Sequence, residues 1–168
     1  MEEKELRRYS RIVVDGDEQA WGLVGLLHDF DYERYPNDAH VSDEEHPSWG
    51  VRLLRERGVD DEICEAILGH ATYSGTPRES TMAKVLFAVD ELAGFIVACV
   101  KVRPKGIADL KPKSVKKKLK DKAFARGVNR DDVRSGAEAL GVDLGEHIEF
   151  VRNAMATIAD ELELPPRS

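Results

Sequence analysis

Residues 21–31 read Trp-Gly-Leu-Val-Gly-Leu-Leu-His-Asp-Phe-Asp, and the interpretation of the whole chain starts from this stretch. Apolar side chains recur in it at helical spacing and predict a helix from about residue 17 to residue 28, at Leu23, Val24, Leu26 and Leu27. Where that helix ends, His28 and Asp29 bring an imidazole and a carboxylate to one point in space. Zn²⁺, Mn²⁺, Fe²⁺ and Ni²⁺ accept both kinds of ligand, so the pair is a candidate metal-binding motif.

Three further residues strengthen that interpretation, because a single His-Asp pair is common by chance. His46, His70 and Asp90 each lie at or near the end of an apolar helical pattern, where side chains can converge on a shared pocket. Each has an ordinary structural alternative as well. His46 and His70 could cap helices or bond a carbonyl group, and His46 directly precedes Pro47, which begins the next helical pattern.

The rest of the chain also shows helical spacing, and the alternation typical of strands is scarce. A loop is predicted over residues 31–46. Further helices are predicted at about residues 47–57, 60–70, 80–102, 112–124, 130–140 and 143–162. The sequence therefore predicts an all-α, single-domain helical bundle of about 6–8 helices. That domain would span residues 1–168, with its core at about residues 17–162.

Composition excludes several classes of protein. The 168 residues are 42% hydrophobic and 34% charged, which is typical of a globular protein and not of a disordered one. The two cysteines, Cys64 and Cys99, lie far apart inside apolar patterns, so we expect two buried thiols and neither a disulfide framework nor a thiolate zinc site. The charged N-terminus does not resemble a signal peptide, and the longest apolar run, Leu92 to Val100, is too short to cross a bilayer. We expect a cytoplasmic protein.

The charge of the chain is unevenly distributed. Its net charge is −7, yet the segment from Lys101 to Arg130 holds 12 basic residues and only two acidic ones. An acidic protein with one basic segment argues against general nucleic-acid binding. The segment is compatible with a local site for a phosphorylated small molecule, and equally with a solvated helix face.

Five stretches taken together resemble a known family: residues 21–33 (WGLVGLLHDFDYE), His46-Pro47, residues 66–70 (AILGH), residues 86–92 (LFAVDEL) and residues 113–128 (KSVKKKLKDKAFARGV). Over about residues 17–155 the chain resembles the HD-domain superfamily of metal-dependent phosphohydrolases, and within it a group of small bacterial predicted hydrolases. The resemblance implies a helical bundle of the HD-domain type that binds one or two divalent transition-metal ions. It makes His28, Asp29 and Asp90 primary metal ligands, and His46 and His70 an additional pair for a second ion.

One ligand of the family pattern is missing, because no histidine precedes His28. Aligning Leu6 to Arg11 with the end of the family's first helix places that histidine just before Met1. Two explanations remain open. Either this polypeptide begins too late and its N-terminal helix is truncated, or the ligand has been lost. In both cases we expect metal affinity below the family norm.

Candidate roles follow from the chemistry of phosphoester hydrolysis. The predicted catalytic residues are Asp29, which would bind the metal and orient its water, Asp31, which would accept a hydrogen bond from a ligand histidine, and Lys84. The predicted substrate-binding residues are Tyr73 and three basic residues spaced by four, Lys118, Lys122 and Arg126.

Other conspicuous side chains have plainer interpretations. His40 lies in a polar loop and is expected to be exposed, and His147 is expected on the surface of the last helix. Trp21 and Trp49 are expected to pack in or around the core.

The leading hypothesis is a metal-dependent phosphohydrolase that acts on a small phosphorylated molecule, such as a nucleotide. The alternative is a catalytically weak HD module that binds a nucleotide or a protein partner. Binding of nucleic acid through Lys111 to Arg130 is a third hypothesis, which the acidic remainder of the chain disfavours. No membrane partner is expected.

Overall fold

The structure is a computed structural model, and it describes residues 17–41 and 44–164. The segment from Leu6 to Arg11, used above to align the chain with the family's first helix, lies outside the described residues. Within them the secondary structure is entirely helical, with seven α-helices, two 3₁₀ helices and no strand, which confirms the all-α fold class. None of the helices in these two ranges combines the length and the apolar character needed to span a membrane.

The chain divides into two compact units, residues 1–87 and residues 88–168. The boundary falls inside helix α5 (Thr81–Lys101), which contributes residues to both units. Organisation of the whole chain as a single domain stays a prediction.

The first unit holds three short helices whose ends follow from local sequence. Helix α2 (Glu18–Leu27) begins after Asp17, whose carboxylate accepts a hydrogen bond from the Gln19 N–H at 3.0 Å. Helix α4 (Asp61–His70) begins in the same way after Asp60, which caps the Glu62 N–H at 2.8 Å. Helix α3 (Ser48–Glu56) follows Pro47 directly. All three boundaries lie within one or two residues of the predicted ones.

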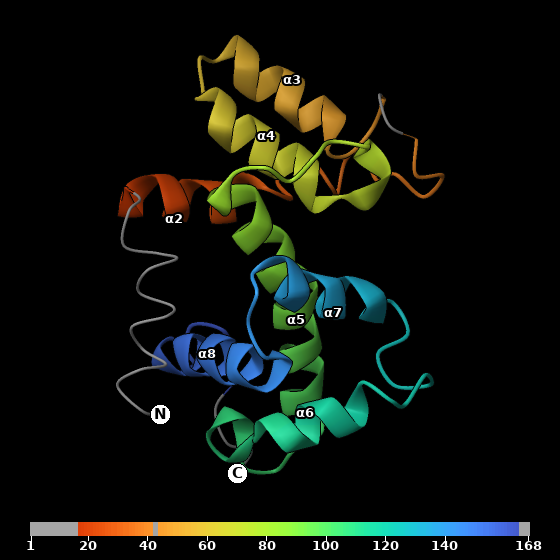
Figure 1. The fold of residues 1–168 in the computed structure, drawn as a ribbon, viewed down its shortest axis with the longest axis vertical. Coiled ribbons are helices and arrows are strands. Elements are labelled where there is room, and N and C mark those ends of the chain that lie inside the picture. Colours follow the sequence, from red (N-terminus) through yellow and green to blue (C-terminus); the bar gives the residue numbers. More distant parts are fainter. Residues whose placement is uncertain (1–16, 42–43, 165–168) are drawn as a thin grey trace. The chain divides into compact units, whose positions relative to one another are not determined.

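Helices α3 and α4 lie side by side, joined by a turn at Gly58, whose φ of +77° is a conformation that glycine adopts without strain (Figure 1). Helix α2 also contacts α4, and a 3₁₀ helix, η1 (Thr72–Ser74), follows α4. The first turns of α5 complete an apolar core made of Val24, Val51, Leu54, Ile63, Cys64, Ala66, Ile67, Met82, Ala83 and Leu86. This core holds the ends of α2, α3 and α4 in place.

The second unit is built on the remainder of α5. A 3₁₀ helix, η2 (Gly106–Asp109), leads to α6 (Pro112–Lys118), α7 (Arg130–Ala139) and α8 (Leu144–Thr157), which are labelled in Figure 1. The core of this unit consists of Leu92, Phe95, Ile96, Cys99, Val100, Ile107, Leu110, Val115, Leu119, Val133, Ile148, Val151 and Leu164. Burial confirms the prediction for both cysteines, and it raises the pKa of the Cys99 thiol to about 11.

Two predicted helices are shorter than expected. The basic helix predicted over residues 112–124 ends at Lys118, because the Asp121 carboxylate accepts the Ala123 N–H at 3.1 Å and competes with helical hydrogen bonding. Lys118, Lys122 and Arg126 therefore do not share a helix face, and that argument from spacing was wrong. The last helix ends at Thr157, because the following turns bring Leu164 into the core.

The expectation for His147 was also wrong. Its side chain is buried, next to Ile148 on the inner face of α8, and its Nε2 lies 2.9 Å from the Ala88 carbonyl oxygen. Burial lowers the pKa of this histidine. The position of His147, next to Ile148 and four residues before Val151, indicated that it lies near the buried face of the helix. Because histidine is polar, it was nevertheless expected to be exposed.

Candidate metal centre

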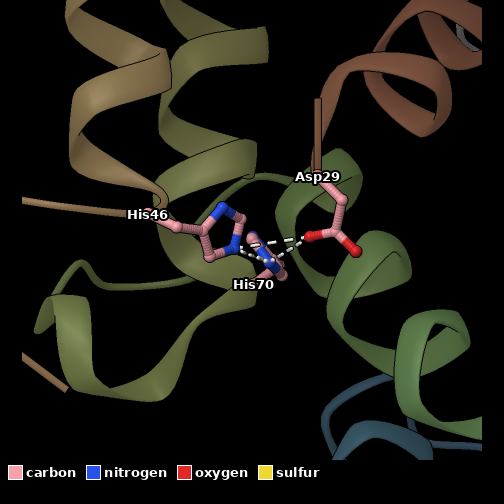
Figure 2. A group of neighbouring side chains, drawn as sticks. All are labelled: Asp29, His46 and His70. Atoms are coloured by element: carbon pink, nitrogen blue, oxygen red, sulfur yellow. Dashed lines mark hydrogen bonds and ion pairs between the residues drawn. The ribbon is translucent and has the colours of Figure 1, made fainter. Parts of the chain in front are cut away.

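Three of the predicted metal ligands come together in the first unit. Asp29 follows the end of α2, His46 lies just before α3, and His70 is the last residue of α4. Figure 2 shows these side chains pointing toward one another from three different segments. Because α4 contacts both α2 and α3, the packing of the three helices brings the ligands to one place.

The donor atoms form a nearly equilateral triangle. The Asp29 Oδ1 lies 3.4 Å from the His46 Nε2 and 3.5 Å from the His70 Nε2, and the two Nε2 atoms are 3.3 Å apart. Two ligands on one tetrahedral or octahedral ion, each bound at about 2.0–2.2 Å, lie about 2.8–3.6 Å apart. The residues present therefore fit a transition-metal ion.

The hydrogen bonds behind the histidines orient their rings for metal binding. The His46 Nδ1–H donates to the Asp31 carboxylate at 2.7 Å, and the His70 Nδ1–H donates to the Ile67 carbonyl. A carboxylate or a carbonyl oxygen can only accept, so the proton of each neutral ring is on Nδ1. The lone pair on each Nε2 therefore points into the cluster, and two such nitrogens at 3.3 Å repel unless a cation lies between them.

His28 is oriented in the same way and lies on the other side of Asp29. Its Nδ1–H donates to the Gly25 carbonyl at 2.8 Å, and its Nε2 is 3.3 Å from the Asp29 Oδ2. Asp29 thus turns one carboxylate oxygen toward His46 and His70 and the other toward His28. In this position the Asp29 carboxylate could bind two adjacent metal ions, one with each oxygen.

The Asp29 carboxyl is held in its ionised form. Burial by itself would raise its pKa, but the adjacent imidazole groups of His28 and His70 outweigh burial and hold the pKa well below its usual range. The side chain remains half exposed. A carboxylate that is both anionic and accessible is a suitable metal ligand.

Asp31 lies behind the cluster and not in it. Its side chain is buried, its Oδ1 accepts from His46, and its Oδ2 accepts the Gly50 N–H at 2.8 Å. With both oxygens occupied, Asp31 acts on His46 and has no free oxygen for a substrate. A Cβ at Gly50 would lie 2.7 Å from the Asp31 Cγ, so this contact requires glycine. Sequence reasoning missed Gly50, whose only signal was a glycine inside an apolar helix.

Asp31→Asn should weaken metal binding by about 10–100-fold while leaving the fold intact. An asparagine oxygen that accepts the Gly50 N–H turns its NH₂ group toward the His46 Nδ1–H. His46 must then move its proton to Nε2, and the metal loses that ligand. Competition with a chromogenic chelator would measure the affinity, with the exposed Asp38→Asn as the matched control. Equal affinities in the two variants would contradict the role given to Asp31.

The loop that carries His46 is held by Asn37, which sequence reasoning did not single out, and by Tyr73, which was predicted to bind substrate. The Asn37 Nδ2 donates to the carbonyls of Val41 and His46 at 2.6 and 2.8 Å. The Tyr73 hydroxyl donates to the same His46 carbonyl at 3.2 Å, and the Tyr73 ring stacks on exposed His40 at 4.5 Å. Burial raises the pKa of Tyr73 to about 12, so the phenol remains a hydrogen-bond donor at neutral pH.

The other predicted site residues lie on α5 or later in the chain. Lys84 is partly buried on α5, and among the described residues of the first unit its ammonium group forms no ion pair. Asp90 lies on α5, in the part that belongs to the second unit, and Lys118, Lys122 and Arg126 lie in the second unit at and after the end of α6. Asp90 as a metal ligand, and Lys84, Lys118, Lys122 and Arg126 as catalytic or substrate-binding residues, stay predictions.

Comparison with known proteins gives one match. A sequence model of the HD domain matches residues 3–94, which is more than half of the chain and includes His28, Asp29, His46, His70 and Asp90. Searches of curated proteins and of solved structures gave no match.

Proposed function

Because the chain belongs to the HD-domain family, a superfamily of metal-dependent phosphohydrolases, we propose that it hydrolyses a phosphoester bond in a small phosphorylated molecule, such as a nucleotide. One or two divalent transition-metal ions would support the reaction, which we place in the cytoplasm. The observation that carries this proposal is the orientation of His46 and His70, whose Nε2 atoms lie within 3.5 Å of the Asp29 Oδ1.

The donor set indicates the kind of metal. Imidazole nitrogens together with carboxylate oxygens suit Mn²⁺, Fe²⁺, Ni²⁺ or Zn²⁺ and disfavour Ca²⁺, which prefers six or more oxygen ligands. The metal would be held by His28, Asp29, His46 and His70. Asp90 on α5 would add the distal carboxylate of the family pattern. When bound, such an ion lowers the pKa of a bound water and neutralises charge on the phosphoryl oxygens.

The protein residues have separate tasks in this proposal. Asp31 keeps the His46 proton on Nδ1, and Asn37 and Tyr73 hold the His46 backbone. Asp29, half exposed and ionised, would bind the metal and orient its water. Four basic residues are proposed to attract the phosphate: Lys84, Lys118, Lys122 and Arg126. The last three do not share a helix, because α6 ends at Lys118.

Metal content is the first test. Protein purified without a chelator or a nickel affinity step should contain about one or two transition-metal ions per chain by elemental analysis. The metal-loaded protein should then hydrolyse p-nitrophenyl phosphate or a nucleoside monophosphate, and stripping the metal should stop turnover. Protein that takes up no Mn²⁺, Ni²⁺ or Zn²⁺ would overturn the metal centre. Protein that binds metal and phosphate but turns over no phosphoester would favour the alternative, a binding module.

A further inference from the structure

We propose that Arg130 is a positioning residue that shapes residues 119–129 into an anion-binding loop, in which Lys122 and Arg126 receive a phosphate group. The inference rests on the proposed function, in which the substrate and one product carry a phosphate group. The binding site itself can be tested without turnover. Sequence spacing suggested basic residues in this region but not what holds them in place.

Arg130 binds the backbone of the loop at several points. Its guanidinium donates to the carbonyls of Val128 at 3.0 Å and Asp121 at 3.1 Å, and also to the carbonyl of Phe124. One rigid, planar group with several donors thus gathers carbonyls from both ends of the loop. A lysine at this position could not satisfy them with the same geometry. The conformation of the loop therefore depends on this single side chain.

The loop is also attached to α5. The Asn129 N–H donates to the Glu91 carboxylate at 3.0 Å, and the Phe124 ring lies edge-on to Phe95 with ring centroids 5.7 Å apart. The guanidinium of Arg130 lies 5.7 Å from the centre of the same Phe95 ring. Glu91 directly follows Asp90, the proposed distal metal ligand. The loop is thus fixed to the part of α5 that belongs to the second unit.

The basic residues of this region differ in what they contact. Lys118 has local partners, since its Nζ lies 3.8 Å from Asp121 and 4.4 Å from the centre of the Phe124 ring. Lys122 and Arg126 are exposed, and within residues 17–41 and 44–164 neither forms an ion pair. Between them Ala125 has a φ of +44°, a conformation unfavourable for alanine that persists only where its surroundings impose it.

These observations indicate a phosphate as the ligand. A basic segment that only faces solvent needs neither the Arg130 hydrogen bonds nor a strained alanine. A loop held in one conformation loses less entropy when it binds an anion. An arginine and a lysine together suit phosphate, because the guanidinium binds two oxygens at once and the ammonium adds a point charge.

The test measures binding of inorganic phosphate to metal-free protein by isothermal titration calorimetry. Lys122→Ala combined with Arg126→Ala should weaken binding by about tenfold or more. Arg130→Gln should weaken it to a similar extent although it removes neither binding residue, and trypsin should then cleave faster after Lys122 and Arg126. Arg134→Gln is the matched control, because Arg134 lies one turn further along α7 and pairs only locally, with Asp131 at 3.0 Å. That variant should match the wild type in both measurements.

Each outcome decides between the claims. Unchanged phosphate affinity in the double variant would overturn the binding site. Loss of affinity in the double variant but not in Arg130→Gln would overturn the positioning role. If Arg130→Gln does not fold, Glu91→Ala removes the anchor of Asn129 instead and should weaken binding in the same direction, and unchanged affinity there would count against the proposal. A protein that binds phosphate at the loop but hydrolyses no phosphoester would contradict the proposed function and leave this site standing.

Discussion

Replacing Asp29 with asparagine should remove metal binding and, with it, any phosphohydrolase activity. Asp29 is the carboxylate that contacts the Nε2 atoms of both His46 and His70, at 3.4 and 3.5 Å. The amide has no charge to offset that of a divalent ion, and its NH₂ group would point donors at the ion or at His28. We expect metal affinity to fall by more than about 100-fold, beyond the cost of losing an outer hydrogen-bond partner.

The fold should tolerate this change. The side chain of Asp29 is half exposed and belongs to a turn after α2, not to the apolar core of the first unit. Elemental analysis and turnover of p-nitrophenyl phosphate would be measured together with the thermal unfolding midpoint. Glu33→Gln, an exposed charge change in the same loop, serves as the control. Metal content equal to that of the wild type in the Asp29 variant would show that the ion binds elsewhere.

Replacing Gly136 with alanine should destabilise the second unit. The added Cβ would lie 2.6 Å from the Ala88 Cα and 3.0 Å from its Cβ, so α7 must move away from α5. The neighbouring atom belongs to the backbone and cannot rotate aside. Overpacking of this kind costs about 1–3 kcal/mol. The better helix propensity of alanine offsets only about 1 kcal/mol of this cost.

The matched control is Gly94→Ala, which changes another helical glycine in the same unit. No atom lies within 4 Å of the Cβ that would be added there, and the position is exposed. That variant should be more stable than the wild type by about 0.5–1 kcal/mol. Urea denaturation followed by circular dichroism would compare the two. We expect the urea concentration at the unfolding midpoint to be highest for Gly94→Ala, intermediate for the wild type and lowest for Gly136→Ala. A midpoint for Gly136→Ala at or above that of the wild type would mean that α7 and α5 do not pack this closely.

Helix positions were predictable from the sequence because they depend on neighbouring residues. Asp17 and Asp60 cap helices two residues away, and apolar spacing marked the inner faces of the helices. The predicted helix ends were wrong where a side chain competed for a backbone N–H of the helix, or where a residue beyond the helix packed into the core. Asp121 ended α6 early through its own backbone turn, and Leu164 ended α8 by packing into the core.

The chemistry of the metal centre was likewise visible in the sequence, since His28, Asp29, His46 and His70 are ligand types at the ends of helical patterns. Which of them meet, and with what support, was decided by tertiary structure. Asp31 precedes His46 by 15 residues and Gly50 by 19, and its contacts with both exist because the segment after α2 folds back against the start of α3.

The sequence by itself therefore determined the positions of most helices and the kinds of ligand, because each of these depends on interactions within a few residues. Only the tertiary structure decided the tautomers of the ligand histidines, the burial of His147 and the clamp formed by Arg130. Each of these depends on a hydrogen bond or a packing contact whose partner local periodicity does not specify. Patterns of apolar spacing show which face of a helix is buried, but not which polar atom of another segment will form a hydrogen bond with a side chain on that face.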